Sequence, residues 1–344
     1  MILLDYTLSE LTELFADVQP YKVKQLYKWL YRGADFDEMT DLPKEWRQRL
    51  KSEHIACPVT ILKKFESKDG TQKFLYKLYD GNLIEGVLMK YKYGNTLCVS
   101  TQVGCRMGCK FCASTLDGLV RNLSSGEILG QVIAVNRYCG GTADDRKITN
   151  IVLMGSGEPL DNFDNTIKFL KSVNAPDGIN ISQRNISLST CGIAPKIIQL
   201  ADMGLQVNLT VSLHSPRQEK RCVLMPISKA YPLGEVVEAA KYYFLKTGRR
   251  VIFEYVLTEG QNDTDEDVAK LTRLTKGFSC HVNLIRLNPV KERDLKPTAD
   301  DAATEFLNKL TKNGVSATLR RQIGVDIDGA CGQLRRRVIK NERY

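Results

Sequence analysis

The sequence predicts an α/β protein in which about six strand–helix units build one parallel sheet. Three observations support this fold class. Short apolar runs alternate with longer amphipathic runs from residue 96 onward, the first 60 residues have helical patterning, and a strand-rich segment lies between these parts. Either an open doubly wound sheet or a barrel satisfies the pattern. In a barrel, functional residues should follow the C-terminal ends of the strands.

Composition places the chain among ordinary globular proteins. Its 344 residues are 43% hydrophobic and 26% charged, which excludes a disordered or collagen-like chain. The net charge of +9 permits a polyanionic partner without requiring one. The N-terminal segment lacks the basic region of a signal peptide, and no run of about 18 apolar residues predicts a membrane span. We therefore expect a cytoplasmic protein without a membrane partner.

The first 60 residues are predicted to form a small helical module. Apolar side chains recur at helical spacing between Tyr21 and Tyr31, and Pro43 begins a second short helix. The basic residues of this module are Lys22, Lys24, Lys28, Arg47 and Arg49. A second basic run, Arg335 to Arg337, lies near the C-terminus. Such residues suit the backbone of a nucleic acid, and a solvated surface explains them equally well.

The next segment, residues 61–95, is predicted to be a β extension. Residues 73–79 and 83–89 have strand character and are joined by the turn Asp80-Gly-Asn82. The alternating part then begins with a strand at 96–101. Further strands are predicted at 150–154, 186–189, 207–213, 251–256 and 282–285, and helices at 125–139, 166–173, 195–203, 233–246, 264–274 and 300–312.

Ten cysteines in a reducing compartment suggest metal, redox or nucleophilic chemistry for some of them and core packing for the rest. Three of them, Cys105, Cys109 and Cys112, form a C-x3-C-x2-C motif in the loop that leaves the first strand of the alternating part. Three thiolates that converge indicate an iron–sulfur or soft-metal site with one open position. A zinc site completed by a distant ligand is the alternative.

The motif resembles the radical S-adenosylmethionine superfamily, and later segments narrow the resemblance to its RlmN/Cfr family of RNA methyltransferases. These segments follow one another as Thr96-Leu-Cys-Val-Ser-Thr-Gln-Val-Gly-Cys105, Met154-Gly-Ser-Gly-Glu-Pro-Leu160, Leu188-Ser-Thr190, Ser212-Leu-His-Ser-Pro216, Val282-Asn-Leu-Ile285, Asn288-Pro289 and Asp326-Ile-Asp-Gly-Ala-Cys-Gly-Gln-Leu334. The resemblance covers about residues 20 to 335. It implies a helical RNA-binding domain (1–60), the β extension (61–95), a partial (β/α)6 barrel (96–320) and a tail (321–344) with a reactive cysteine.

The resemblance also implies two cofactors, a [4Fe–4S] cluster on the cysteine triplet and S-adenosylmethionine, with two molecules of the latter used per turnover. The residues that match the family's S-adenosylmethionine contacts are Gly157, Glu158, Ser189, Ser212, Leu213, His214 and Asn288. A carboxylate at Glu158 can accept a hydrogen bond from the methionine ammonium. Any single Ser or Asn at a strand end is equally well explained as a helix cap.

The implied reaction methylates carbon 2 of adenine 2503 in 23S ribosomal RNA and of adenine 37 in transfer RNA. Carbon 2 is electron-poor, so radical chemistry has a physical rationale. In the family's route Cys331 becomes an S-methylcysteine, Glu85 accepts the ring proton, and Cys98 releases the product by forming a transient disulfide with Cys331. Taken without the resemblance, Cys98 is a buried strand thiol, Cys331 a surface thiol and Glu85 a solvent-facing residue.

Two alternatives remain open at this point. A Cfr-type enzyme would methylate carbon 8 of the same ribosomal adenine, although Pro159 and the loop Cys112-Ala-Ser-Thr115 favour the RlmN branch. A zinc-stabilised RNA-binding protein without catalysis is the more distant alternative. The expected partners are 23S ribosomal RNA, transfer RNA and a reducing system such as flavodoxin or ferredoxin, and we expect a monomer.

Overall fold

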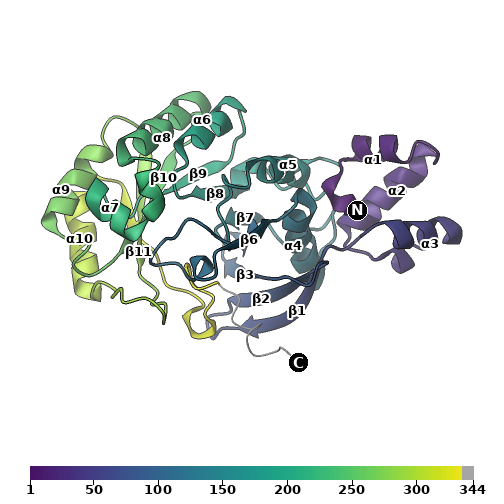
Figure 1. Ribbon diagram of the computed structural model, residues 1–344, viewed down its shortest axis with the longest axis horizontal. Helices are drawn as coiled ribbons and strands as arrows, with labels where there is room; N and C mark the ends of the chain where they lie inside the picture. Colours follow the sequence, from purple (N-terminus) through teal and green to yellow (C-terminus); the bar gives the residue numbers. More distant parts are fainter. Residues whose placement is uncertain (335–344) are drawn as a thin grey trace.

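The structure, a computed structural model, describes residues 1–334 and is built around one ten-stranded sheet that curls into an incomplete barrel. The strand order is β1-β2-β3-β4-β7-β8-β9-β10-β11-β12. The sheet begins at β1 and ends at β12, so the barrel stays open at that seam. Helices cover its outer face, and the N-terminal helices stand apart at one side (Figure 1). The predicted α/β fold, a partial (β/α)6 barrel with a helical N-terminal part and a β extension, is confirmed.

Six parallel strands form the barrel proper, and each is followed along the chain by a helix. The strands are β4 (Gly94–Cys98), β7 (Asn150–Leu153), β8 (Ile186–Thr190), β9 (Asn208–Ser212), β10 (Val251–Leu257) and β11 (Cys280–Arg286). A short parallel strand that the sequence did not predict, β12 (Ala317–Leu319), pairs with β11. The helices are α4 (Ser125–Tyr138), α5 (Phe163–Asn174), α6 (Ala194–Asp202), α7 (Gln218–Leu224), α8 (Leu233–Thr247), α9 (Asp265–Leu274) and α10 (Asp300–Lys312).

Side chains alternate along the barrel strands between an apolar outer face and a polar inner face. In β8, Ile186 and Leu188 are fully buried in the core, while Ser187 and Ser189 border the barrel's hollows. The same alternation continues in the neighbouring strands β9, β10 and β11. The interior is therefore hollow, with polar side chains such as Ser189 and Glu254 among apolar ones such as Val256 and Ile285. It differs from the packed interior of an eight-stranded barrel and leaves room for ligands.

Three antiparallel strands extend the sheet beyond β4: β1 (Val59–Glu66), β2 (Gln72–Leu78) and β3 (Leu83–Tyr91). The predicted hairpin between β2 and β3 is confirmed. Its turn is stabilised by Asp80, whose carboxylate accepts a hydrogen bond from the Asn82 amide at 3.0 Å, and Gly81 takes a left-handed φ of 84°. Strand β1 was not predicted because its exposed lysines interrupt the apolar pattern.

The N-terminal module contains α1 (Leu8–Leu14), α2 (Pro20–Tyr31) and α3 (Lys44–Glu53). Helix α2 buries Val23, Leu26 and Leu30 and exposes Lys24 and Lys28, as its helical periodicity predicts. The remaining short elements are β5 (Gln102–Gly104), β6 (Leu119–Asn122) and the 3-10 turns η1 (Leu3–Asp5), η2 (Phe36–Glu38), η3 (Ala113–Thr115), η4 (Gln183–Asn185), η5 (Pro226–Lys229) and η6 (Val325–Ile327).

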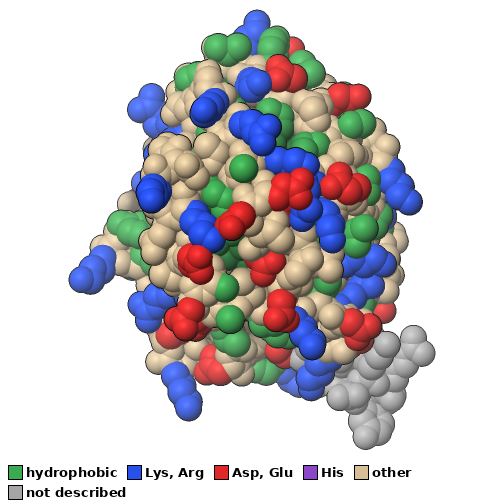
Figure 2. All heavy atoms as spheres, turned by 90° about the vertical axis from the view of Figure 1, so that its left-hand side faces the viewer, with side chains coloured by type: hydrophobic (Ala, Val, Ile, Leu, Met, Phe, Trp, Pro, Cys, Tyr) green, Lys and Arg blue, Asp and Glu red, His purple; other side chains and the backbone are tan. Residues whose placement is uncertain are grey.

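The outer surface over α9 and α10 carries Lys and Arg interspersed with Asp and Glu, as Figure 2 shows. Lys309 illustrates the pattern because its ammonium lies 2.6 Å from Asp265 and 2.8 Å from Glu305. This face therefore has the mixed charge of a solvated helical layer. No helix among residues 1–334 is long and apolar enough to cross a membrane.

Candidate active site

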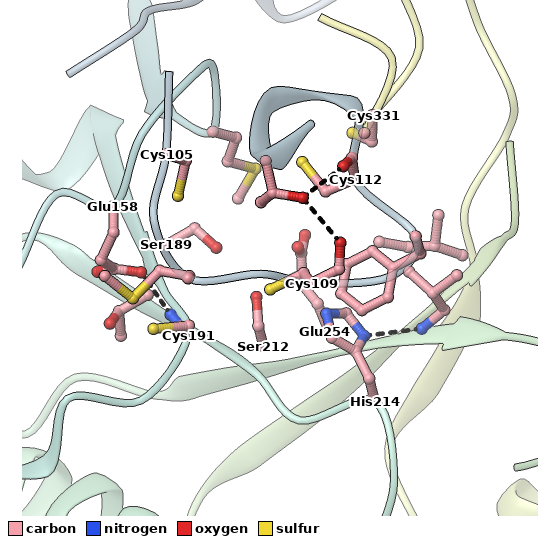
Figure 3. A pocket seen from close by; sticks show the side chains of 18 of the residues that line it. Cys105, Cys109, Cys112, Glu158, Ser189, Cys191, Ser212, His214, Glu254 and Cys331 are labelled. Carbon is pink, nitrogen blue, oxygen red and sulfur yellow. Dashed lines mark hydrogen bonds between the residues drawn. The ribbon is translucent and has the colours of Figure 1, made fainter. Parts of the chain in front are cut away.

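The carboxyl ends of the barrel strands surround a hollow of about 860 Å³, a volume that includes its open mouth (Figure 3). Residues from the cysteine loop, from the ends of five strands (β7 to β11) and from the C-terminal tail meet there. The predicted site residues that line it are Cys105, Cys109, Cys112, Gly157, Glu158, Ser189, Ser212, His214, Asn288 and Cys331. The structure thus brings these ten predicted positions together at the carboxyl ends of the barrel strands, and their roles stay a prediction.

The cysteine loop is fixed by its own backbone. Gly104 has a left-handed φ of 80°, and a Cβ there would lie 2.0 Å from the carbonyl oxygen of Gly118, so only glycine fits. The Thr115 hydroxyl donates to the carbonyl oxygens of Cys109, at 3.1 Å, and Cys112, at 2.9 Å. These bonds hold the loop in a curve with its three thiols on the hollow.

The donor set fits an iron–sulfur cluster. Burial raises the pKa of the Cys105 thiol to about 12 and that of Cys109 well above its usual range. Buried thiols of this kind lose their protons readily only to a coordinating cation. Among residues 1–334, no three His, Cys, Asp or Glu side chains converge on a single metal ion. The three thiols border one hollow, and cysteine thiolates are the ligands that iron–sulfur clusters take.

Glu158 lies at the floor of the hollow, beyond the end of β7. Its carboxylate accepts hydrogen bonds from the amide of Cys191 at 2.7 Å and from the amide of Leu160 at 3.0 Å. Burial raises the pKa of this carboxyl, although the two amides lower it. The preceding Gly157 has a φ of 107°, and a Cβ there would lie 2.6 Å from Gln102 Cβ, so the turn requires glycine.

His214 sits just past β9 with an unusual left-handed φ of 53°. Its Nδ1 accepts a hydrogen bond from the Val256 amide at 3.0 Å, and its ring packs edge-on against Phe111. Burial and the nearby Arg221 lower the pKa of this imidazole to about 3, so His214 is neutral and carries its proton on Nε2. A neutral donor therefore faces the region that Figure 3 shows between His214 and the cysteine loop.

The Leu213 side chain does not reach the hollow. It alternates with Ser212 and His214 along the chain, is fully buried in the core, and packs on the opposite side. Its backbone amide donates to the Glu254 carbonyl at 3.0 Å. Any contact of Leu213 with a ligand is therefore limited to its backbone.

The C-terminal tail delivers Cys331 to the rim of the hollow. The side-chain amide of Asn288 donates to the Cys331 carbonyl at 3.1 Å, and the backbone amide of Ala113 in the cysteine loop donates to the Gly332 carbonyl at 2.7 Å. Cys331 also borders a second, smaller hollow that contains Cys98 at the end of β4. The two thiols therefore face the same apolar space, and Cys331 lies between it and the main hollow.

All ten cysteines are free thiols in this structure, so the disulfide implied between Cys98 and Cys331 is not present. Burial raises the pKa of Cys98 to about 12. For Cys331, burial raises the pKa and the guanidinium of Arg320 lowers it. Burial keeps the pKa of Cys331 raised as well, and the charge of Arg320 opposes that effect at both thiols, with a hydrogen bond to Cys331 in addition.

Glu85 does not line the main hollow. It lies on β3, is 4% exposed, and borders a small cavity together with Ser114 and Ser156. The Lys73 ammonium on β2 lies 3.5 Å from the Glu85 carboxylate. The Ser114 hydroxyl also contacts the tail, because it donates a hydrogen bond to the Leu334 carbonyl at 2.9 Å. The residue is buried, which contradicts the solvent-facing interpretation.

The structure adds residues that sequence reasoning missed. Cys191, assigned to core packing, lines the main hollow, as does Glu254 from β10. Glu254 was detectable as a lone charge in an apolar strand; its carboxylate lies 3.7 Å from Arg320. No pattern in the sequence predicts that Cys191 lines the hollow, because its position depends on the turn after β8.

The basic N-terminal residues are only partly available to a ligand. Arg49 pairs with Asp17 at 3.0 Å, and Arg47 donates to the Asp37 carbonyl at 2.9 Å. Lys24 and Lys28 border a groove between α2 and the barrel. Residues 335 to 337, the second basic run, lie outside the described residues.

Comparison with known proteins identifies the two parts of the chain. Residues 99–272 match the model of the radical SAM superfamily, and residues 1–56 match the ribosomal RNA large subunit methyltransferase N-terminal domain. The chain is 51% identical to the "Probable dual-specificity RNA methyltransferase RlmN" of Clostridium perfringens over 99% of this chain and 98% of that one. The protein of the same description from Clostridium novyi is 48% identical over 98% and 99%.

The chain belongs to the RlmN family of radical S-adenosylmethionine RNA methyltransferases. A crystal structure of a radical SAM methyltransferase from Sphaerobacter thermophilus superimposes with a TM-score of 0.93, at 43% identity, covering 97% of this chain and 99% of that one. Membership in the RlmN family makes the protein an S-adenosylmethionine-dependent enzyme that acts on RNA. The superfamily implies S-adenosylmethionine and a [4Fe–4S] cluster.

Proposed function

We propose that this RlmN-family enzyme methylates carbon 2 of adenine 2503 in 23S ribosomal RNA and of adenine 37 in transfer RNA, with Cys331 as the methyl carrier. The observation that carries the proposal is the position of Cys331 between the hollow of the cysteine triplet and the pocket of Cys98. A carrier must receive its methyl group on one side and be released by a second thiol, and this position serves both steps.

Cys105, Cys109 and Cys112 would hold the cluster, and Glu158, Ser189, Ser212, His214 and Asn288 would surround S-adenosylmethionine. When bound, these two groups supply the methyl group and the one-electron chemistry that removes hydrogen from a carbon atom. Two molecules of S-adenosylmethionine are used per turnover, one for the methyl group and one for the radical step. The electron comes from a reducing partner such as flavodoxin or ferredoxin, and the enzyme acts as a monomer.

The chain's own residues complete the reaction. The guanidinium of Arg320 favours the thiolate of Cys331, which is the form that accepts a methyl group. After the methyl carbon is joined to carbon 2, Glu85 accepts the ring proton. Cys98 then attacks the Cys331 sulfur, so the sulfur–sulfur bond forms as the carbon–sulfur bond breaks. The released carbon takes a proton to complete the methyl group, and the one electron that the radical step consumed is returned. A reductant must open this disulfide before the next turnover.

The target adenine must leave its stack to reach a hollow inside a barrel, so we propose a flipped or single-stranded base. Lys24 and Lys28, which border the groove beside α2, would hold the RNA backbone together with other basic residues of the module. Their contribution should weaken as salt concentration rises.

The test is nucleoside mass spectrometry of RNA from cells with and without the gene. The expected result is loss of 2-methyladenosine from ribosomal and transfer RNA. Loss of 8-methyladenosine alone would overturn the proposal in favour of a Cfr-type enzyme. An anaerobic absorbance spectrum of the purified protein completes the test, because a colourless protein that binds zinc would contradict the radical mechanism.

A further inference from the structure

Arg221 is a fully buried arginine on α7, directly beneath the hollow. Its guanidinium donates four hydrogen bonds, each to a neutral acceptor. The acceptors are the carbonyl oxygens of Leu213 at 3.1 Å, Ser212 at 3.1 Å and Cys191 at 2.7 Å, and the hydroxyl of Ser228 at 2.6 Å. Among residues 1–334, its hydrogen bonds go to carbonyl and hydroxyl oxygens alone, and none goes to a carboxylate.

Arg217, one helical turn earlier, shows the usual arrangement. Its guanidinium forms ion pairs with Asp267 at 2.9 Å and with Glu266 at 3.1 Å. A buried charge without a counter-charge costs several kcal/mol. A buried, unpaired arginine therefore indicates one of two things. Either an anion lies near it in the working state of the protein, or its hydrogen bonds alone offset the free energy of burying the charge.

The cysteine loop lies against the helix that carries Arg221. The Lys110 amide, within the C-x3-C-x2-C motif, donates to the carbonyl of Leu224 on α7 at 2.8 Å. A Cβ on Gly108 of the same loop would lie 3.5 Å from Pro226, which follows α7. Cys191, whose carbonyl Arg221 binds, lines the hollow beside the three cysteines. The unpaired cation thus sits behind the proposed cluster site.

We propose that Arg221 is the counter-charge of the iron–sulfur cluster and raises its reduction potential. The proposal rests on the proposed function, since it requires that Cys105, Cys109 and Cys112 hold the cluster. Three thiolates give the cluster site net negative charge, and reduction by one electron from the flavodoxin- or ferredoxin-class donor adds another. A fixed cation in a low-dielectric site stabilises the reduced state more than the oxidised one. Arg221 itself is unchanged and acts as a positioning residue.

The test is a redox titration of the anaerobically reconstituted full chain, without S-adenosylmethionine, followed by electron paramagnetic resonance. Arg221→Gln removes the charge, Arg221→Lys retains it, and Arg217→Gln is the matched control on the same segment. We expect Arg221→Gln to disfavour reduction by about tenfold or more, equivalent to a potential about 59 mV lower. Arg221→Lys should recover most of the shift, and Arg217→Gln should change the equilibrium by less than about twofold.

A second variant keeps the experiment decisive if Arg221→Gln does not fold. Ser228→Asp leaves Arg221 in place and adds a carboxylate at the hydroxyl that it binds, so it should also lower the potential. A purely structural Arg221 predicts lower thermal stability with an unchanged potential, and that result in folded, iron-loaded variants would overturn the inference. Wild-type protein that binds no iron would instead overturn the proposed function, because the inference concerns only the potential of a cluster already bound.

Discussion

The cysteine loop and the C-terminal tail bring thiols to one hollow by different means. The loop carries three cysteines within eight residues and is fixed locally by Thr115 and Gly104. The tail carries Cys331 and is held by contacts with distant parts of the chain. Its Asp326 accepts a hydrogen bond from the Ser67 hydroxyl at 2.6 Å, and its Gly324 amide donates to Asp69 at 2.9 Å. The curve of the proposed metal-ligand loop is thus set by local backbone, with long-range contacts such as that of Lys110 with Leu224 added to it, whereas the proposed carrier thiol depends on long-range packing throughout.

The sharpest way to break this comparison is to remove one thiol from each region. Cys109→Ala should lose the cluster, whereas Cys331→Ala should retain iron and its absorbance. Both should lower RNA methylation by about a thousandfold or more, since each removes a group that the reaction requires. Iron content and methylation are measured on the same preparations. Equal loss of iron in both variants would show that the tail thiol is a ligand and not a carrier.

The proposed base, Glu85, lies on β3, 3.5 Å from the Lys73 ammonium, and shares a cavity with Ser114, which donates a hydrogen bond to the tail. Glu85→Gln should reduce methylation by roughly 10²–10⁴-fold, the range for loss of a general base. Lys73→Met should reduce the free energy of unfolding by about 3–5 kcal/mol, because it removes one partner of a buried ion pair. The loss of methylation is measured from initial rates, and the loss of stability is measured by chemical denaturation.

The double variant Lys73→Met/Glu85→Gln serves as the control for that pair. It should be more stable than Lys73→Met alone, since the carboxylate is then neutral as well. Additive losses of stability in the double variant would mean that the two side chains are not coupled.

Gly157, in the turn after β7, tests whether backbone geometry sets the position of Glu158 in the hollow. Gly157→Ala forces a Cβ into a left-handed turn against Gln102 and should cost about 1–3 kcal/mol of stability. S-adenosylmethionine binding, measured by calorimetry, should weaken because the turn positions Glu158. Gly140, which also has a left-handed φ but meets nothing within 4 Å, provides the control for conformational strain alone.

The smallest expected effect concerns the contacts that hold the tail. Burial raises the pKa of Asp69, but hydrogen bonds from Thr71 and the Gly324 amide lower it to about 2. Because this folded-state pKa lies below the ordinary value, the contact contributes stability above about pH 4 and loses it as the pH falls toward 2. Asp69→Asn should therefore speed amide hydrogen exchange in residues 324–330 severalfold at neutral pH.

The difference between Asp69→Asn and wild type should persist at pH 5 and shrink below pH 4. Glu66→Gln is the matched control. Glu66 ends β1, close to Asp69 in the turn between β1 and β2, and it pairs with Lys64 at 3.0 Å, away from the tail. An equal increase in exchange with Glu66→Gln would assign the effect to the hairpin as a whole.

The contrast between local and long-range contacts also explains which parts of the structure the sequence could predict. The long helices and the six barrel strands follow from periodicity, and the cysteine triplet from spacing. Short elements such as α7 and β12 gave too few residues for a pattern. Glu254 and Cys191 reach the hollow only when strands assemble, and Arg221 depends on a helix that periodicity missed. The motif also does not show that the Leu213 side chain packs in the core while its neighbours Ser212 and His214 border the hollow.

The most direct test of the account follows the methyl group through Cys331. The protein is incubated anaerobically with S-adenosylmethionine labelled in its methyl group, then given RNA. Peptide and nucleoside mass spectrometry track the label at each stage. We expect the label to appear first on the Cys331 peptide and then on carbon 2 of adenine, with a matching loss from the peptide. Label that enters RNA without residing on Cys331, or RNA methylation by Cys331→Ala, would contradict it.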